Sequence, residues 1–149
     1  MLRPTVDMIR MVTEQHSLSA ADRRARRTAL HYAAVDGDLR LVESLVADGA
    51  DVDAQDSNGM TALHFAAQES RRDIVVSLLA SGAEVDLVDR HGNTALSTAV
   101  YNYKDDDSRE CVTLLMSAGA NRHQVNNHGV SPEGLALMVA NYNARKFFQ

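Results

Sequence analysis

The same pattern of residues recurs every 33 residues along this 149-residue chain. The tripeptide Thr-Ala-Leu begins at Thr28, Thr61 and Thr94, and similar residues follow each copy in the same order. A fourth, weaker copy begins at Ser131, 37 residues after Thr94, because the third copy carries a four-residue insertion. Self-similarity with a period of about 20 to 50 residues indicates units that stack on one another, since one unit alone cannot bury its apolar face.

Each unit is predicted to form a helix, a turn, a second helix and an extended finger. The opening threonine can cap the first helix, because its hydroxyl accepts a hydrogen bond from a backbone N–H of the first turn. In the central unit, Leu63 and Ala66–Ala67 fall on one face at helical spacing, and a second apolar row runs from Ile74 to Leu79. Gly82 follows the second helix, where a left-handed residue can end it, and Asn58-Gly59 predicts a tight fingertip turn.

Thr-Ala-Leu-His-x-Ala-Ala, repeated every 33 residues, resembles the ankyrin repeat, which has Thr-Pro-Leu-His-x-Ala at the same place. The resemblance covers about residues 23–149. It implies an all-α fold, an ankyrin-repeat solenoid of helix-turn-helix units with β-hairpin fingers, capped at both ends. We expect a single ankyrin-repeat domain over residues 1–149. Its expected parts are an N-terminal capping half-repeat (1–22), three repeats (23–55, 56–88 and 89–125) and a C-terminal capping repeat (126–149).

Composition and charge narrow the function classes. The net charge of −5 disfavours nucleic-acid binding, which needs a basic surface, although residues 1–30 alone carry six arginines and three acidic residues. No apolar stretch approaches the length of a signal peptide or a membrane helix. A single cysteine excludes an intrachain disulfide and a cysteine-based zinc site. We therefore expect a cytoplasmic monomer that binds neither nucleic acid nor membrane.

The histidines and the cysteine are the residues that could support catalysis or metal binding. His31 and His64 follow a capping threonine by three residues, where the resemblance implies a structural histidine, hydrogen-bonded within and between repeats. Cys111 shares its register with Leu41 and Ile74, which predicts a buried residue packed as a small hydrophobe. No zinc-protease, phosphate-loop or nucleophile-elbow motif occurs, so we expect no catalytic residues, no metal and no cofactor.

Three places depart from the repeat pattern. The arginine-rich run 22–27 can form a solvated first finger or contact an acidic partner surface, and Arg26, in place of the fingertip glycine, predicts an irregular or mobile finger. The insertion within 101–107 is expected to lengthen a solvated turn between two helices, and a partner contact through exposed tyrosines is the alternative. Glu133 stands where earlier units have leucine, which leaves the packing of the last inner helix open.

The resemblance to ankyrin proteins implies a concave groove between the fingertips and the first helices of the units. Stacking requires the repeated residues, whereas positions that differ between units are free to meet a partner. The candidate positions around the fingers are Arg24, Arg27, Ser57, Asn58, Met60, Arg90, His91, Asn93 and His128. Those on the first helices and the insertion are Val35, Asp36, Gln68, Glu69, Tyr101, Asn102 and Tyr103. Tyrosine, arginine and methionine are enriched at protein interfaces. The expected anchors are Tyr101, Tyr103, Arg90 and Met60.

These observations predict a non-catalytic protein-protein interaction module that binds a partner protein through its groove and fingertips, as a scaffold or adaptor. An alternative comes from a resemblance to small bacterial stand-alone ankyrin proteins, some of which serve as immunity proteins. Under that alternative, the chain is an inhibitor that neutralises a toxin enzyme by occluding its active site. Beyond residue 30 the chain carries nine basic and seventeen acidic residues, so its acidic body would associate quickly with a basic cleft.

Overall fold

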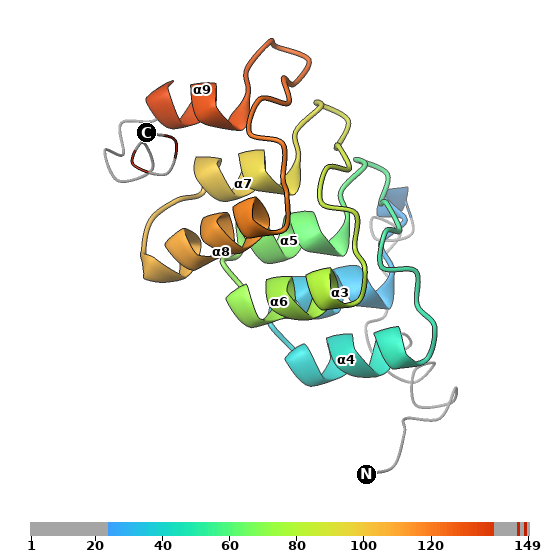
Figure 1. The fold of residues 1–149 in the computed structure, drawn as a ribbon. Coiled ribbons are helices and arrows are strands. Elements are labelled where there is room, and N and C mark those ends of the chain that lie inside the picture. The colour runs from blue at the N-terminus through green and yellow to red at the C-terminus, as the bar shows by residue number, and fades with distance from the viewer. Residues whose placement is uncertain (1–23, 139–145, 147, 149) are drawn as a thin grey trace.

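The computed structural model describes residues 24–138, 146 and 148. These residues form seven helices in two rows (Figure 1). The inner row contains α3 (Ala29–Asp36), α5 (Ala62–Gln68), α7 (Ala95–Tyr101) and α9 (Pro132–Met138). The outer row contains α4 (Leu39–Ala47), α6 (Arg72–Ala80) and α8 (Asp106–Ser117). Helices of the same row stack on one another, and α3, α5 and α7 each pack against the outer helix that follows.

The core is built from the predicted apolar positions of both rows. Leu63, Leu96, Val75 and Val112 belong to one cluster of buried side chains. Alanines such as Ala66 are buried in the inner row, and their small side chains let neighbouring helices approach closely. The predicted all-α stack of helix-turn-helix units is therefore confirmed for the described residues.

Three of the inner helices begin where the sequence predicts, because a threonine caps each of them. Thr28, Thr61 and Thr94 are extended residues that precede α3, α5 and α7. Each hydroxyl oxygen accepts a hydrogen bond from the backbone N–H three residues later. This N–H has no partner within its helix, so the cap stabilises the helix at that starting point.

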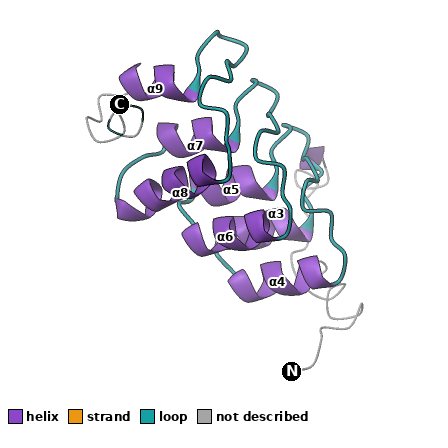
Figure 2. Cartoon of the chain, viewed as in Figure 1, coloured by secondary structure: helices purple, strands orange, loops and turns teal. Residues whose placement is uncertain are grey.

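Between the outer helix of one repeat and the inner helix of the next, the chain forms a finger that ends in a tight turn (Figure 2). No residue in the described part of the chain is in a β-strand, so the predicted β-hairpin geometry is not confirmed. Two backbone hydrogen bonds of 2.9 Å close the second fingertip, from Asp56 N–H to the Met60 carbonyl and from Gly59 N–H to the Asp56 carbonyl. The Asp56 carboxylate also accepts from the N–H groups of Asn58 and Met60. Equivalent bonds form at Asp89 and Asn126, so the second, third and fourth fingertips are turns supported by a side chain.

One backbone hydrogen bond joins each fingertip to the next. The N–H of Ser57 donates to the carbonyl of Ala25 at 2.7 Å, and equivalent bonds join the later fingers. Arg26 has a φ of 53°, and Gly59, in the same register, has a φ of 75°. Arg26 therefore keeps the left-handed backbone of the fingertip glycine, whereas Arg24 and Ala25 before it are helical and not part of a turn as in the later fingers. The first finger thus departs from the regular pattern, and its predicted mobility stays a prediction.

The insertion in the third repeat lengthens a helix as well as a turn. Helix α8 has 12 residues, whereas α4 and α6 have nine each. Asp105 caps α8, because its carboxylate accepts hydrogen bonds from the N–H and the hydroxyl of Ser108 at 2.9 and 2.8 Å. Tyr103 is only 9 % exposed and belongs to the core. Lys104–Asp107 are exposed, as expected of a solvated insertion. The expectation of an exposed Tyr103 is wrong, because its side chain packs into the core.

At the C-terminal end of the stack, Glu133 forms polar contacts where earlier units have a core leucine. Its carboxylate lies 2.8 Å from the Arg122 guanidinium and 3.1 Å from Nδ1 of His123. The predicted N-terminal cap (1–22) and residues 139–145 of the C-terminal cap lie outside the described residues, so the domain boundaries stay a prediction. In the part of the chain that the structure describes, none of the helices is long and apolar enough to cross a membrane.

Candidate functional site

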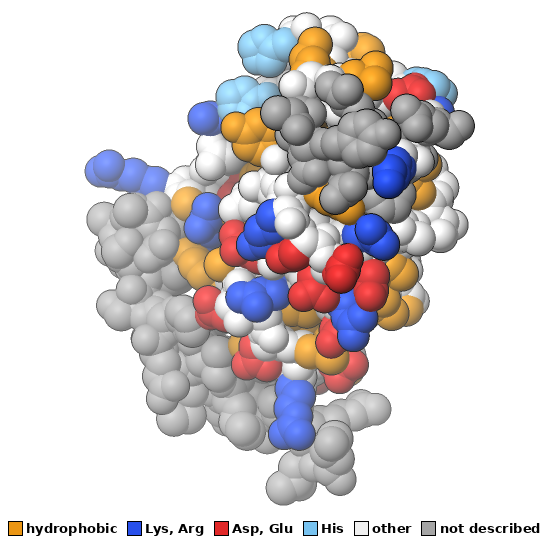
Figure 3. Space-filling view, turned by 90° about the vertical axis from the view of Figure 1, so that its left-hand side faces the viewer, with side chains coloured by type: hydrophobic (Ala, Val, Ile, Leu, Met, Phe, Trp, Pro, Cys, Tyr) orange, Lys and Arg blue, Asp and Glu red, His pale blue; other side chains and the backbone are white. Residues whose placement is uncertain are grey.

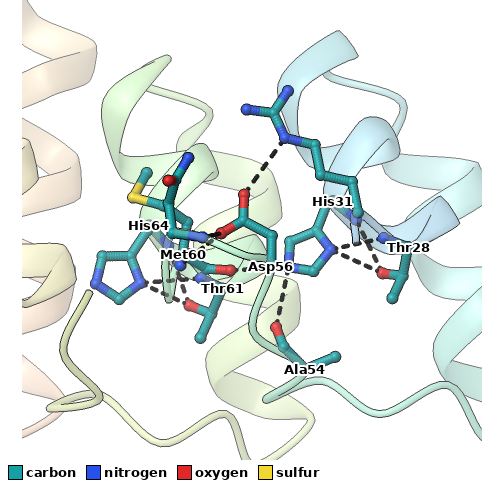
Figure 4. A network of polar contacts seen from close by, with 9 residues as sticks. Thr28, His31, Ala54, Asp56, Met60, Thr61 and His64 are labelled. Carbon is teal, nitrogen blue, oxygen red and sulfur yellow. Dashed lines mark hydrogen bonds and ion pairs between the residues drawn. The ribbon is translucent and has the colours of Figure 1, made fainter. Parts of the chain in front are cut away.

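His31 ties helix α3 to the second finger (Figure 4). Its Nδ1 accepts a hydrogen bond from the backbone N–H of Thr28 at 2.9 Å, so the ring proton lies on Nε2. Nε2 lies 2.9 Å from the carbonyl oxygens of both Ala54 and Met60 on that finger. Burial of the ring lowers its pKa, so His31 makes these bonds as a neutral group at neutral pH.

His64 has the same role one repeat later. Its Nδ1 accepts from the N–H of Thr61 at 3.2 Å, and its Nε2 lies 2.9 Å from the carbonyl oxygen of Asn93. Burial also lowers the pKa of this ring. The structural role predicted for both histidines is confirmed, and it holds the fingers against the inner helices.

A partly buried ion pair joins the first finger to the second. Nε of Arg27 lies 3.4 Å from Oδ2 of Asp56, whose side chain is fully buried. In Figure 4, Asp56 lies between the rings of His31 and His64. The guanidinium carbon of Arg27 lies 4.7 Å from the ring centroid of Phe65 on α5. Arg27, a candidate for partner contact, is therefore already engaged within the chain by a carboxylate and an aromatic face.

An open groove of about 380 Å³ lies along the third repeat, between the inner helices and the fingers. It brings together five of the candidate residues: Met60, Gln68, Asn93, Tyr101 and Asn102. Tyr101, at the end of α7, is 69 % exposed, so most of its ring is open to contact. The candidate residues of the lining combine an aromatic ring, a thioether and three side-chain amides, a mixture that suits contact with protein side chains.

Sequence comparison of the units did not select five further residues that line the groove: Asp89, Ser97, Thr98, Asn126 and Leu135. Ser97 and Thr98 stand in the register of His64 and Phe65, and their smaller side chains leave room beside α7. The replacement of His64 and Phe65 by these smaller residues is visible in the sequence and could have identified Ser97 and Thr98 as lining a groove. Asp89 and Asn126 occupy the turn position of their fingers, which gave no signal of a place in the groove.

The remaining candidates lie outside this groove. Those exposed on the fingers and at the end of α3 are Arg24, Asp36, Ser57, Arg90, His91 and His128. Those that are partly buried are Val35, Asn58 and Glu69. Nε of Arg90 lies 3.1 Å from Nε2 of His91, so these two fingertip side chains are neighbours. Tyr103 is removed from the candidate contacts by its burial in the core.

The face formed by the turns within the repeats carries side chains of both charges (Figure 3). Arg72 at the start of α6 lies 2.6 Å from Glu110 of α8 and 3.5 Å from Asp73. Because opposite charges pair with each other here, this face presents a mixed rather than a uniform charge. Within the described residues, no group of three or more His, Cys, Asp or Glu side chains is placed to hold a metal ion.

Comparison with protein-family models matches the chain to a model described as ankyrin repeats, in three copies, over residues 7–89 and 30–128. A search of curated proteins gave no match. The matched ranges contain helices α3 to α8 with their capping threonines, structural histidines and tight-turned fingers. This chain belongs to the ankyrin-repeat family.

Proposed function

We propose that this chain is a non-catalytic module that binds a partner protein through its concave groove and fingertips. Ankyrin repeats generally mediate protein–protein interactions, and proteins built from them are typically non-catalytic. The observation that carries the choice of surface is the exposed Tyr101 ring at an open groove of about 380 Å³. An exposed aromatic ring supplies a large contact area at low cost in conformational entropy.

Order in the groove supports the same proposal. The carbonyl oxygens of Met60 and Asn93 lie 2.9 Å from buried histidine rings, which fixes these finger residues. The side chain of Asn93 also accepts a hydrogen bond from Nδ2 of Asn126 at 2.9 Å. A surface that is already ordered loses little conformational entropy on binding, so more of the contact free energy contributes to affinity.

The test is capture of the partner from the native host, with the wild-type chain and with the double variant Arg90→Ala/Tyr101→Ala. Val76→Ala is the matched control, because Val76 is exposed on the outer helix α6. Circular dichroism verifies that all three proteins are folded. We expect one stoichiometric partner with the wild type and the control. Loss of hot-spot side chains should weaken its binding to the double variant by about 30-fold or more.

Capture of the same partner by the folded double variant, with unchanged affinity, would contradict the assignment of the groove. Calorimetry with the purified partner gives the stoichiometry and the affinity of each variant. A partner bound equally by all three proteins directs attention to Asp105–Asp107 and to the arginine-rich run of the first finger.

The inhibitor hypothesis predicts more than binding. It is motivated by the acidic balance beyond residue 30, with seventeen acidic and nine basic residues. The captured partner is then an enzyme with a basic cleft, and its activity falls in proportion to the chain added until one equivalent is present. An adaptor leaves the partner's activity unchanged, so an activity assay with and without the chain separates the two hypotheses.

A further inference from the structure

One pair of side chains recurs in register where each finger meets the next. One member is the residue before a capping threonine, and the other is the turn residue of the next finger. The described residues contain three such pairs: Arg27–Asp56, Met60–Asp89 and Asn93–Asn126. The repeated backbone holds the three pairs in equivalent places, so they can be compared directly.

The first and third pairs are closed within the chain. Arg27 Nε lies 3.4 Å from Oδ2 of Asp56, and its guanidinium carbon lies 4.7 Å from the ring centroid of Phe65. In the third pair, Nδ2 of Asn126 donates to Oδ1 of Asn93 at 2.9 Å. In both places the turn residue has a polar partner on the preceding finger.

The second pair is open. Met60 has no group that can pair with a carboxylate, and no ion pair to Asp89 forms among the described residues. Thr98 stands where the previous repeat has Phe65, so the second pair lacks an equivalent of the ring on which Arg27 stacks. The groove of about 380 Å³ lies at this place, and Met60, Asp89 and Thr98 all line it.

The charge of Asp89 has no part in the geometry of its turn. Oδ1 of Asp89 accepts the turn hydrogen bonds, from the N–H groups of His91 and Asn93 at 2.8 and 2.9 Å. The amide oxygen of Asn126 accepts the two equivalent bonds in the next finger, at 2.9 and 3.0 Å. An uncharged amide therefore supports this turn as well as a carboxylate does, and Oδ2 of Asp89 remains available to a cation.

We propose that the groove binds an arginine side chain of the partner protein, with the guanidinium paired to Oδ2 of Asp89. This inference rests on the proposed function and names the side chain that the groove recognises. The bound guanidinium takes the place that Arg27 has one repeat earlier, and its methylene groups pack against Met60. Tyr101 lines the same groove and offers an aromatic face in place of the absent phenylalanine.

The chemistry of the lining favours arginine over other side chains. The groove contains the carboxylate of Asp89 and neither lysine nor arginine, so its charge complements a cation. A guanidinium is planar, so it can stack on a ring while its N–H groups donate to a carboxylate and to amide oxygens. Gln68 and Asn102 supply such amide oxygens within the same lining. A lysine ammonium cannot stack in this way.

The probe is the peptide acetyl-Ala-Arg-Ala-amide, and the control peptide carries citrulline, which keeps the shape of arginine without its charge. Binding to the full chain is followed by NMR, through the backbone N–H shifts of His91 and Asn93, which donate to Asp89. We expect saturable shifts with the arginine peptide. Loss of a charge-assisted hydrogen bond should make the affinity for the citrulline peptide lower by about tenfold or more.

Two variants test the site independently. Asp89→Asn keeps the turn bonds, as Asn126 does, and should abolish the preference for arginine over citrulline. Met60→Arg supplies a guanidinium from within the chain, as Arg27 does, and should block the arginine peptide. Circular dichroism verifies that both variants are folded. Equal affinity for the two peptides, an unchanged preference in Asp89→Asn, or undiminished binding by Met60→Arg would each overturn the proposal.

Failure of this inference can be told apart from failure of the proposed function. An absent arginine preference, with the captured partner still lost by Arg90→Ala/Tyr101→Ala, refutes the arginine site and leaves protein binding through the groove intact. A clear arginine preference, with the partner retained by the double variant, supports the site and refutes the groove as the main contact with that partner.

Discussion

Burial of His64 makes the stability of this fold depend on pH. The ring is 1 % exposed, and burial lowers its pKa below the ordinary value of 6.5. Below about pH 6.5 the unfolded chain takes up a proton that the folded ring resists, so unfolding becomes more favourable. The contribution of neutral His64 is therefore complete above the pKa of the unfolded histidine. It is lost as the pH falls from there towards the lower pKa of the folded ring.

The size of the effect follows from proton linkage. A group that is protonated only in the unfolded state changes the free energy of unfolding by about 1.4 kcal/mol per pH unit. Between about pH 7.5 and about pH 5.5, one such histidine contributes a loss of up to about 1.4 kcal/mol. His31 is equally buried, and burial lowers its pKa too. The two rings together therefore contribute a loss of up to about 3 kcal/mol.

The variant His64→Ser isolates one of these contributions. Serine stands at the same place in the third repeat, where the N–H of Ser97 donates to the hydroxyl of Thr94 at 3.2 Å, so the substitution keeps the helix cap. Urea unfolding measures the free energy of unfolding of both proteins at the two pH values. The variant is less stable than the wild type at both pH values. Its free energy of unfolding should fall less than that of the wild type between about pH 7.5 and about pH 5.5, by up to about 1.4 kcal/mol.

His128→Ser is the matched control, since His128 is exposed on a fingertip, and it should keep the wild-type loss. An equal loss in the wild type and in His64→Ser would refute the conclusion that burial holds His64 neutral. A destabilisation that is the same at both pH values does not affect this test, because only the difference between the two pH values is compared.

Leu63→Ala removes a core side chain and should lower the free energy of unfolding by about 2–5 kcal/mol, whereas Val76→Ala on the exposed face of α6 should cost far less in the same urea melt. Equal effects would contradict the proposed register. Arg26→Gly should raise stability by about 0.5 kcal/mol in thermal unfolding, because glycine adopts a φ of 53° without strain, and a loss of stability would refute this. Burial raises the pKa of Cys111 to about 12, so a thiol reagent at about pH 8 should label it only after unfolding. Rapid labelling of the folded chain would contradict its core position.

Much of the fold could be predicted because stacking makes the same demands on every unit. Each repeat needs a hydroxyl to cap its inner helix, as Thr61 does, and small residues such as Ala66 between neighbouring helices. The burial of Cys111 follows from the same register, and the resemblance to ankyrin repeats implied the structural roles of His31 and His64. The departures at Tyr103 and α8 could not be predicted this way, because an insertion has no equivalent in the other units.

The sequence by itself determined the repeat period, the helix caps and the core, since these depend on how each residue serves its own helix or turn. Only the tertiary structure decided which side chains of neighbouring repeats meet. Arg27 and Asp56 are 29 residues apart, and no periodicity indicates that these two side chains pair. Nor does it indicate that Asp89 lacks such an arginine partner. The groove is lined by the small residues Ser97 and Thr98 of α7 and by Met60, which cannot form an ion pair with Asp89. These residues meet only when the repeats stack.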